Sequence, residues 1–173
     1  SGAVAADSSG NGFNGAYVGS PLLNQPGAPV GLTDPAIQLS LGNGYMVTPN
    51  LTAQFGANTS VSLSVWFKSP AGGGVVVNEI GQADPNGGWR DSQIEVQPSG
   101  EVRIRVWPFG ALSLGTASFN AWHHVVLRYD QATSTLNGFL DGVASAGSLV
   151  GGRQAPQNAG FAQYYALGTT DPT

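Results

Sequence analysis

Hydrophobic and polar residues alternate along several short segments of the chain. The alternation is strictest in residues 60–69, where every second position from Val61 to Phe67 is apolar. A two-residue period places successive side chains on opposite faces of an extended strand. Residues 73–81, by contrast, form a more continuous apolar run, which also indicates a strand. Further strands are predicted at 91–97, 101–107, 123–130, 135–142 and 164–168.

Turn-forming residues separate these segments. Pro98, Ser99 and Gly100 lie between 91–97 and 101–107, so these two strands are predicted to form a hairpin. Residues 19–36 hold four prolines and are expected to form a long surface loop. No window shows a good helical period. We therefore predict an all-β fold with one domain over residues 1–173, a two-sheet antiparallel β-sandwich.

Composition narrows the class of protein. Charged residues make up only 9% of the 173 residues, whereas 26 are glycine, which favours strands and turns over solvated helices. The net charge is −4 with a single lysine, which argues against nucleic-acid binding. No apolar run is long enough to span a membrane. The start of the chain shows no secretory leader pattern, and cysteine is absent. Much Gly, Ser, Thr and Asn with little Lys is typical of secreted or cell-surface microbial proteins.

The stretch from 120 to 145 contains two adjacent histidines and several aspartates. His123 and His124 are consecutive in a predicted strand, so they point to opposite faces and cannot bind one metal ion together. Asp130 and Asp141 end their predicted strands and are expected to stabilise turns. This stretch therefore indicates a hairpin rather than a metal centre.

Three motifs resemble one known family. WHHVVLRYD followed by LNGFLDGV, the earlier DSSGNGFNG at 7–15, and SVSLSVWFK are similar to segments of laminin-G-like, concanavalin A-like domains of bacterial extracellular proteins. The resemblance implies a jelly-roll sandwich whose concave sheet often binds glycans.

The chain departs from that family at both ends. Such domains usually begin with a strand before the DSSGNGFNG motif and close with a strand that pairs beside it, and from the sequence we expect neither strand here. We expect an open groove of unpaired backbone in their place. Either the chain was trimmed, or another copy or a parent chain supplies the missing strands.

Two groups of residues are candidates for ligand binding. Alternation gathers Gln93, Glu95, Arg103, Arg105 and Trp107 on one side of the hairpin. Aromatic rings stack on apolar sugar faces, while Arg and carboxylates bond hydroxyl groups. The alternative is that cross-strand Glu–Arg pairs only stabilise the sheet.

Trp66, His124, Arg128 and Phe139 are candidates for the corresponding face of neighbouring strands, although Trp66 is expected in or near the core. The second group is Trp89, Arg90 and Asp91 in a glycine-rich loop. Loop residues of this kind contact ligands or cover the core.

A third candidate is a calcium site. Asp7, Ser8 and Asn11 offer the hard oxygen ligands that Ca²⁺ prefers, and members of the resembling family often carry a structural ion near this loop. The alternative is a plain turn closed by the aspartate.

The sequence thus predicts an extracellular, non-catalytic module that binds a polysaccharide or other glycan. The first alternative is a structural surface or filament subunit completed by a strand from a neighbouring chain. The second is a part of a polysaccharide-degrading enzyme, with Glu95 and His124 as the residues considered for catalysis. Nucleophile-elbow and phosphate-loop motifs are absent from the sequence.

Overall fold

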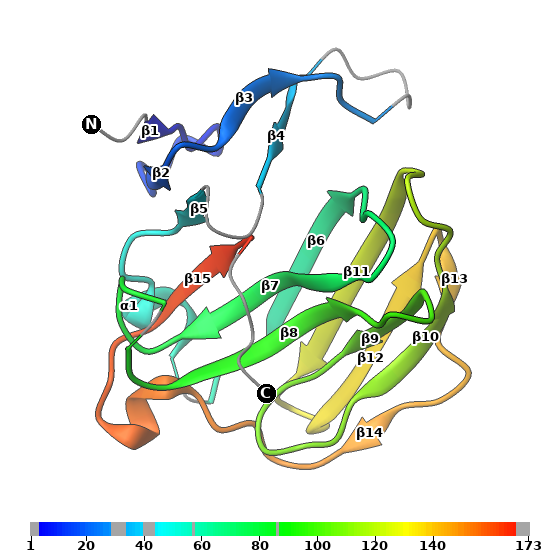
Figure 1. Cartoon of the computed structure of the whole chain (residues 1–173). Helices are drawn as coiled ribbons and strands as arrows, with labels where there is room; N and C mark the ends of the chain where they lie inside the picture. The colour runs from blue at the N-terminus through cyan, green and yellow to red at the C-terminus, as the bar shows by residue number, and fades with distance from the viewer. Residues whose placement is uncertain (1–3, 29–33, 40–43, 57, 86, 169–173) are drawn as a thin grey trace.

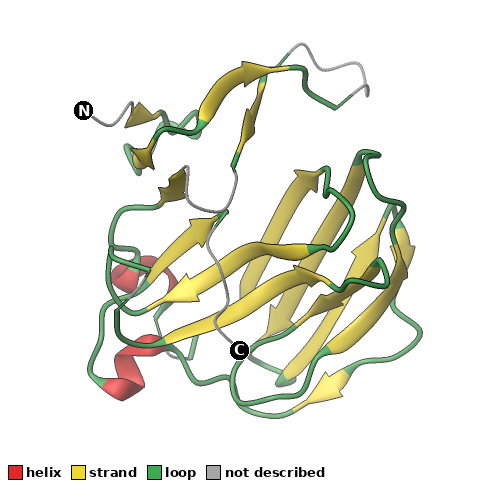
Figure 2. Ribbon diagram, in the orientation of Figure 1, coloured by secondary structure: helices red, strands yellow, loops and turns green. Residues whose placement is uncertain are grey.

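The computed structural model describes residues 4–28, 34–39, 44–56, 58–85 and 87–168. Within these residues, two antiparallel sheets pack face to face and a small two-stranded sheet lies beside them (Figure 1). Strands dominate the fold and helices are short (Figure 2). The predicted all-β sandwich is therefore confirmed.

The large sheet contains, in spatial order, β1 (Val4–Ala5), β2 (Gly15–Gly19), β5 (Gly44–Val47), β15 (Tyr164–Leu167), β7 (Gly74–Ile80), β8 (Arg90–Val96), β9 (Glu101–Ile104) and β10 (Leu112–Thr116). The short strand β1 comes before the DSSGNGFNG motif and pairs with β2, so the expectation that no strand precedes this motif is wrong. The second sheet contains β13 (Val143–Ala144), β12 (Thr135–Leu140), β11 (His123–Asp130) and β6 (Val61–Phe67), with β14 (Leu149–Val150) also paired to β12. The small sheet is β3 (Leu22–Gln25) with β4 (Ala36–Gln38). The short helices are α1 (Thr52–Phe55) and the 3-10 helix Pro156–Ala159.

The core lies between the two sheets and follows the alternation in the sequence. Val125, Leu127 and Tyr129 of β11 are fully buried, whereas Arg128 is exposed. Ile94 and Ile104 meet them from the large sheet and are also fully buried. Each such side chain contributes about 1.5–3 kcal/mol through removal of apolar surface from water. The buried and outer faces of each sheet are thereby fixed.

The predicted hairpin of β8 and β9 is confirmed. Gly100 adopts φ 85°, and its N–H donates to the carbonyl of Gln97 at 2.8 Å, which closes the turn. The second strand is shorter than expected and ends at Ile104. Pro108, shortly after it, has no N–H with which to extend a ladder.

The predicted loop over 19–36 is wrong in part. Leu22–Gln25 forms β3 inside that range, and Leu22 lies opposite Gln38 of β4. The prolines indicated a loop, but Pro21 and Pro26 stand just outside the strand, where they disturb no ladder hydrogen bond. Residues 29–33 of that range lie outside the described part of the chain.

Among the described helices, none is long and apolar enough to cross a membrane.

Gly138 tests how closely the sheets pack. It lies on the buried face of β12, where an added Cβ would meet the carbonyl oxygen of Val126 and Cδ1 of Ile104. We expect Gly138→Ala to lower the free energy of unfolding by about 1–3 kcal/mol, because a packed core tolerates extra volume poorly. Urea unfolding measures this. Gly110→Ala is the control, since a Cβ there meets nothing within 4 Å. Equal stabilities of the two variants would contradict the packing described.

Candidate functional site

Glu95 and Arg103 lie opposite each other on the outer face of the β8–β9 hairpin. Each has a hydrogen-bond partner two residues away along the chain. The Arg103 guanidinium donates to Oε2 of Glu101 from Nε at 2.9 Å and from Nη2 at 2.6 Å. Glu95 Oε1 accepts a hydrogen bond from Gln97 Nε2 at 2.8 Å. The hydrogen bond from Arg103 holds the pKa of Glu101 below its usual range. This arrangement agrees with the alternative stated above, in which the Glu and Arg side chains of the hairpin stabilise the sheet.

Gln93 and Arg105 do not lie with Glu95 and Arg103, which we call the outer patch. Arg105 forms an ion pair with the buried carboxylate of Asp91, with 2.8 Å between Nε and Oδ1, and donates to Ser92 Oγ at 3.1 Å. Gln93 is fully buried and donates from Nε2 to Asp91 at 2.9 Å and to Glu79 at 3.2 Å. The pairing of β7 with β8 skips Gln93, so the strict alternation assumed from the sequence is broken there.

A buried polar cluster surrounds Glu79 at this end of the sandwich. Glu79 is 0% exposed and accepts one charged hydrogen bond from Arg153 and one hydrogen bond from Gln163. Gln163 Nε2 also donates to the hydroxyl of Tyr165 at 2.9 Å. Arg153 Nη1 reaches the carbonyl of Phe55 at the end of α1, at 3.4 Å. The cluster therefore joins the large sheet to the short helix.

Burial raises the pKa of Glu79 to about 7, although Arg153 acts in the opposite direction. A carboxyl group with a raised pKa is typical of a general acid. Glu79, however, has no exposed surface, so no dissolved polymer reaches it. We therefore assign a structural role to this cluster. No signal in the local sequence links Glu79 to Arg153, because 74 residues separate them.

Trp89, Arg90 and Trp107 lie toward the end of the hairpin that is opposite its turn. The Trp89 carbonyl accepts the N–H of Gly81 at 2.7 Å, and Arg90 Nη1 donates to the carbonyl of Pro85 at 3.0 Å. The Trp89 side chain is half-buried, whereas Trp107 is 43% exposed. Trp107 is thus the more accessible of the two rings.

His124 lies on a different surface from these residues. It belongs to β11 of the second sheet, and its side chain is on the face opposite to buried Val125. Glu95 is on the outer face of the large sheet. The two sheets meet through their buried faces, so Glu95 and His124 lie on opposite sides of the sandwich. The expected common face is wrong, and the pair considered for catalysis is not formed.

An aromatic strip covers the outer face of the second sheet; we define it as Trp66, His124 and Phe139. Trp66 lies directly opposite His124, and their rings stack with centroids 4.9 Å apart and planes 27° apart. His124 Nε2 is 2.9 Å from Ser64 Oγ, which fixes the orientation of the imidazole. Trp66 is 37% and Phe139 38% exposed. The expectation that Trp66 lies in or near the core is therefore wrong, as the alternation of β6 places it outward.

Cationic groups flank the aromatic strip. Arg128 is exposed on the same face, at a register position beside Asn137 of β12, with 3.8 Å between its Nη2 and Asp130 Oδ2. At the end of β6, Lys68 Nζ lies 5.8 Å from the ring centroid of Trp122. The face thus combines flat apolar rings with hydrogen-bond donors.

His123 takes different partners, as predicted for consecutive residues of a strand. Its Nδ1 is 2.6 Å from Asp141 Oδ2, and Asp141 Oδ1 accepts the backbone N–H of His124 at 2.8 Å. Burial opposes ionisation of Asp141, but these hydrogen bonds outweigh it and lower its pKa. Asp130 stabilises its turn as expected, since Oδ1 accepts the N–H of Ala132 at 3.0 Å. Asp141 instead anchors both histidines.

The loop of the expected calcium site is closed by its own hydrogen bonds. Asp7 Oδ1 accepts the N–H of Ser9 at 2.8 Å, and Oδ2 accepts the Ser9 hydroxyl at 2.8 Å and the N–H of Phe13 at 2.9 Å. The Ser9 hydroxyl lowers the pKa of Asp7. Asn11 donates its N–H to Ser9 Oγ at 3.3 Å, and the side chain of Ser8 is exposed. In the part of the chain that the structure describes, no cluster of three His, Cys, Asp or Glu side chains that could hold a metal ion occurs.

Comparison with known proteins gives one family match. The family described as the concanavalin A-like lectin/glucanases superfamily matches residues 40–171. No curated protein matches the chain.

Two solved structures are similar to this chain at low sequence identity. Domain 4 of AbnA, an extracellular arabinanase from Geobacillus stearothermophilus in complex with arabinotriose, is 16% identical with a TM-score of 0.51, over 98% of this chain and 84% of that one. LamAcat from Zobellia galactanivorans is 13% identical with a TM-score of 0.41, over 91% of this chain and 66% of that one.

Glu79 gives the stability a pH dependence. Its pKa rises from 4.5 to about 7 on folding, so the folded protein holds this proton to a higher pH than the unfolded chain. Stability from this group is present below pH 4.5 and is lost as the pH rises to about 7. Between pH 4 and 8, the unfolding free energy of the wild type is expected to fall relative to that of Glu79→Gln, by on the order of 3 kcal/mol. If the unfolding free energies of the two proteins changed equally with pH, this prediction would be contradicted.

Calcium binding near Asp7 stays a prediction. Adding a chelator to protein equilibrated with calcium is expected to lower its melting temperature, because a bound ion stabilises the folded state alone. Asp7→Asn replaces the charged carboxylate ligand by a neutral amide and is expected to abolish the effect of the chelator on the melting temperature. An unchanged melting temperature of the wild type removes the proposal.

Proposed function

Because the chain belongs to the concanavalin A-like lectin/glucanases superfamily, we propose that it is a non-catalytic module that binds a polysaccharide or oligosaccharide on its aromatic strip. The observation that carries the proposal is the exposed, stacked pair of Trp66 and His124, extended by Phe139 on the neighbouring strand. A rigid aromatic surface favours the apolar face of a sugar ring, since little side-chain freedom is lost on binding.

Polar groups for the sugar hydroxyls lie next to these rings. Arg128 is on the same strand as His124, two residues beyond Val126, and donates hydrogen bonds in a fixed fork. Ser64 and Asn137 lie on the same face. Sites for small ligands generally combine a few such polar groups with aromatic walls.

The outer patch of Glu95 and Arg103 supports the proposal less well. Its charged groups are hydrogen-bonded to Gln97 and Glu101, so a ligand would have to break those bonds. Trp107, with Trp89 and Arg90, remains a second location for the same function, because Trp107 is the most exposed of the named rings. The secreted or cell-surface location is part of this proposal.

The saccharide class is open to a direct screen. Arabinotriose is the first probe, because the arabinanase domain of similar fold was solved with it. Oligosaccharides of other plant and microbial polysaccharides form the rest of the panel.

Substitutions distinguish the two locations. For a saccharide that binds, Trp66→Ala is expected to raise the dissociation constant about tenfold, which corresponds to ~1.4 kcal/mol. Trp107→Ala, which removes an exposed tryptophan elsewhere, is expected to leave the constant unchanged. Isothermal titration calorimetry measures both, with circular dichroism to verify folding.

Three results would contradict this proposal. Loss of affinity in Trp107→Ala with Trp66→Ala unaffected would move the site to the large sheet. Absence of binding across the panel would remove the carbohydrate-binding function. Turnover of a polysaccharide that disappears in Glu95→Gln would establish an enzyme instead.

A further inference from the structure

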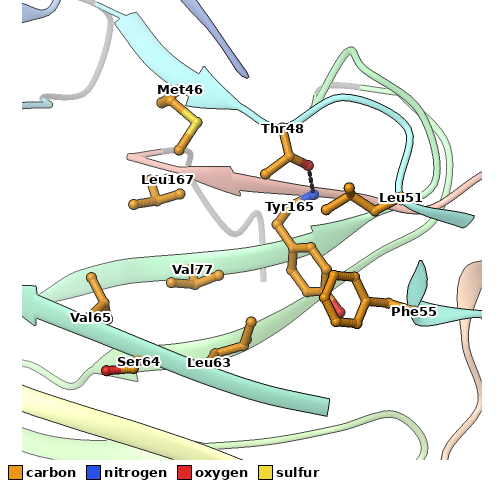
Figure 3. Close-up of a pocket in the computed structure, with 10 residues that line it drawn as sticks. All are labelled: Met46, Thr48, Leu51, Phe55, Leu63, Ser64, Val65, Val77, Tyr165 and Leu167. Atoms are coloured by element: carbon orange, nitrogen blue, oxygen red, sulfur yellow. Dashed lines mark hydrogen bonds between the residues drawn. The ribbon is translucent and has the colours of Figure 1, made fainter. Parts of the chain in front are cut away.

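An apolar groove lies beside the outermost strand of the second sheet (Figure 3). Its volume is about 310 Å³. Leu63 and Val65 of β6 line one side, and the large sheet lines the other with Val77, Tyr165 and Leu167, as Figure 3 shows. These residues belong to the buried faces of their sheets, so the groove is an uncovered continuation of the core.

The groove exists because the large sheet extends farther than the second sheet. Beyond β7 the large sheet continues through β15 and β5, whereas β6 is the last described strand of the second sheet. The middle of β6 is affected most. Its inward residues Leu63 and Val65 are only half-buried, whereas Val61 and Phe67 at its two ends are buried.

Within the described residues, the backbone of β6 is paired on one side only. Among the described strands, β6 pairs only with β11. Alternate N–H and C=O groups of such a strand point away from its single neighbour and can pair with another strand. Edge strands are commonly protected by charged residues or proline, but residues 61–67 contain neither.

The apolar groove and the unpaired edge of β6 together indicate which class of ligand would bind here. An acyl chain would fill the apolar space but leave the backbone groups of β6 unpaired, at a cost of about 1–3 kcal/mol for each group that it shields from water. An extended peptide satisfies both demands. The groove has about twice the volume of the ~150 Å³ apolar cavity that holds one benzene molecule, which is room for two aliphatic side chains.

A second copy of the chain fits less well. In a two-fold dimer joined along β6, each copy would bring its own overhanging β15 and β5 into the same space. A single strand meets no such obstacle.

We propose that this groove binds an extended peptide segment of a partner protein, which adds to the second sheet beside β6 and places an apolar side chain into the groove at every second residue. In an ideal strand, successive side chains on one face are ~6.6 Å apart. This inference is independent of the proposed glycan binding, because the aromatic strip is on the outer face of the sheet.

The test uses the peptide Lys-Val-Thr-Val-Ser-Val-Thr-Val-Lys as the probe. Calorimetry is expected to show binding, and amide NMR signals of β6 and β15 are expected to shift. A peptide of equal composition with its valines in one block should bind at least tenfold more weakly. N-methylation at alternate residues on the hydrogen-bonding edge should have the same effect, because it removes the N–H donors.

Matched variants locate the contact. Val65→Thr adds a hydroxyl to the groove and is expected to weaken peptide binding at least fivefold. Val126→Thr makes the same change on the outer face of β11 and is expected to leave peptide binding unchanged. Circular dichroism verifies that both variants fold.

Several results would contradict the proposed peptide binding. Binding of palmitate without binding of the peptide would identify a lipid site and overturn the proposal. Dimerisation of the protein that is abolished by Val65→Thr would assign the groove to a second copy. No binding of the peptide at millimolar concentration, or equal binding of the N-methylated peptide, would also overturn it. Each of these results leaves saccharide binding by the aromatic strip to be judged by its own titration.

Discussion

The packing of one sheet against the other through alternate residues is the constraint on which the rest depends. Because every second side chain of β11 and β12 is committed to the core, the residues between them are presented outward in a fixed register. A shift of one residue would bury His124 and expose Leu127. The position of the aromatic strip therefore does not depend on a loop. It follows from the same pattern that forms the core, and Trp66 is brought to His124 by the pairing of β6 with β11.

Local sequence predicted the strands whose alternation is long and regular, such as β6, β11 and β12. It missed β5 and β10, because Gly44–Val47 and Leu112–Thr116 are short, contain glycine and acquire their strand conformation from neighbours. The opposition of Glu95 and Arg103 followed from the hairpin. The burial of Gln93 did not, since the irregularity between β7 and β8 changes its environment and has no signature in the residues themselves.

The groove beside β6 and the aromatic strip occupy the two faces of the same strand. The side chains of Leu63 and Val65 face inward to the groove. The Ser64 hydroxyl and the Trp66 ring contact His124 on the outer face. A segment bound along β6 would stiffen the strand without covering the indole of Trp66. The two proposed interactions are thus compatible, and the architecture allows one short element to take part in both.

The buried hydrogen bonds of Glu79 connect segments that are distant along the chain. Through Arg153 and Gln163 they tie β7 to the region around the 3-10 helix and to the end of α1. If any one of these segments opened, the carboxylate of Glu79 or the guanidinium of Arg153 would lose hydrogen-bond partners. Opening a single segment therefore costs nearly as much free energy as opening them together. Amide protons in all of them would then exchange with solvent at a similar rate, as a single cooperative unit rather than as independently fraying ends.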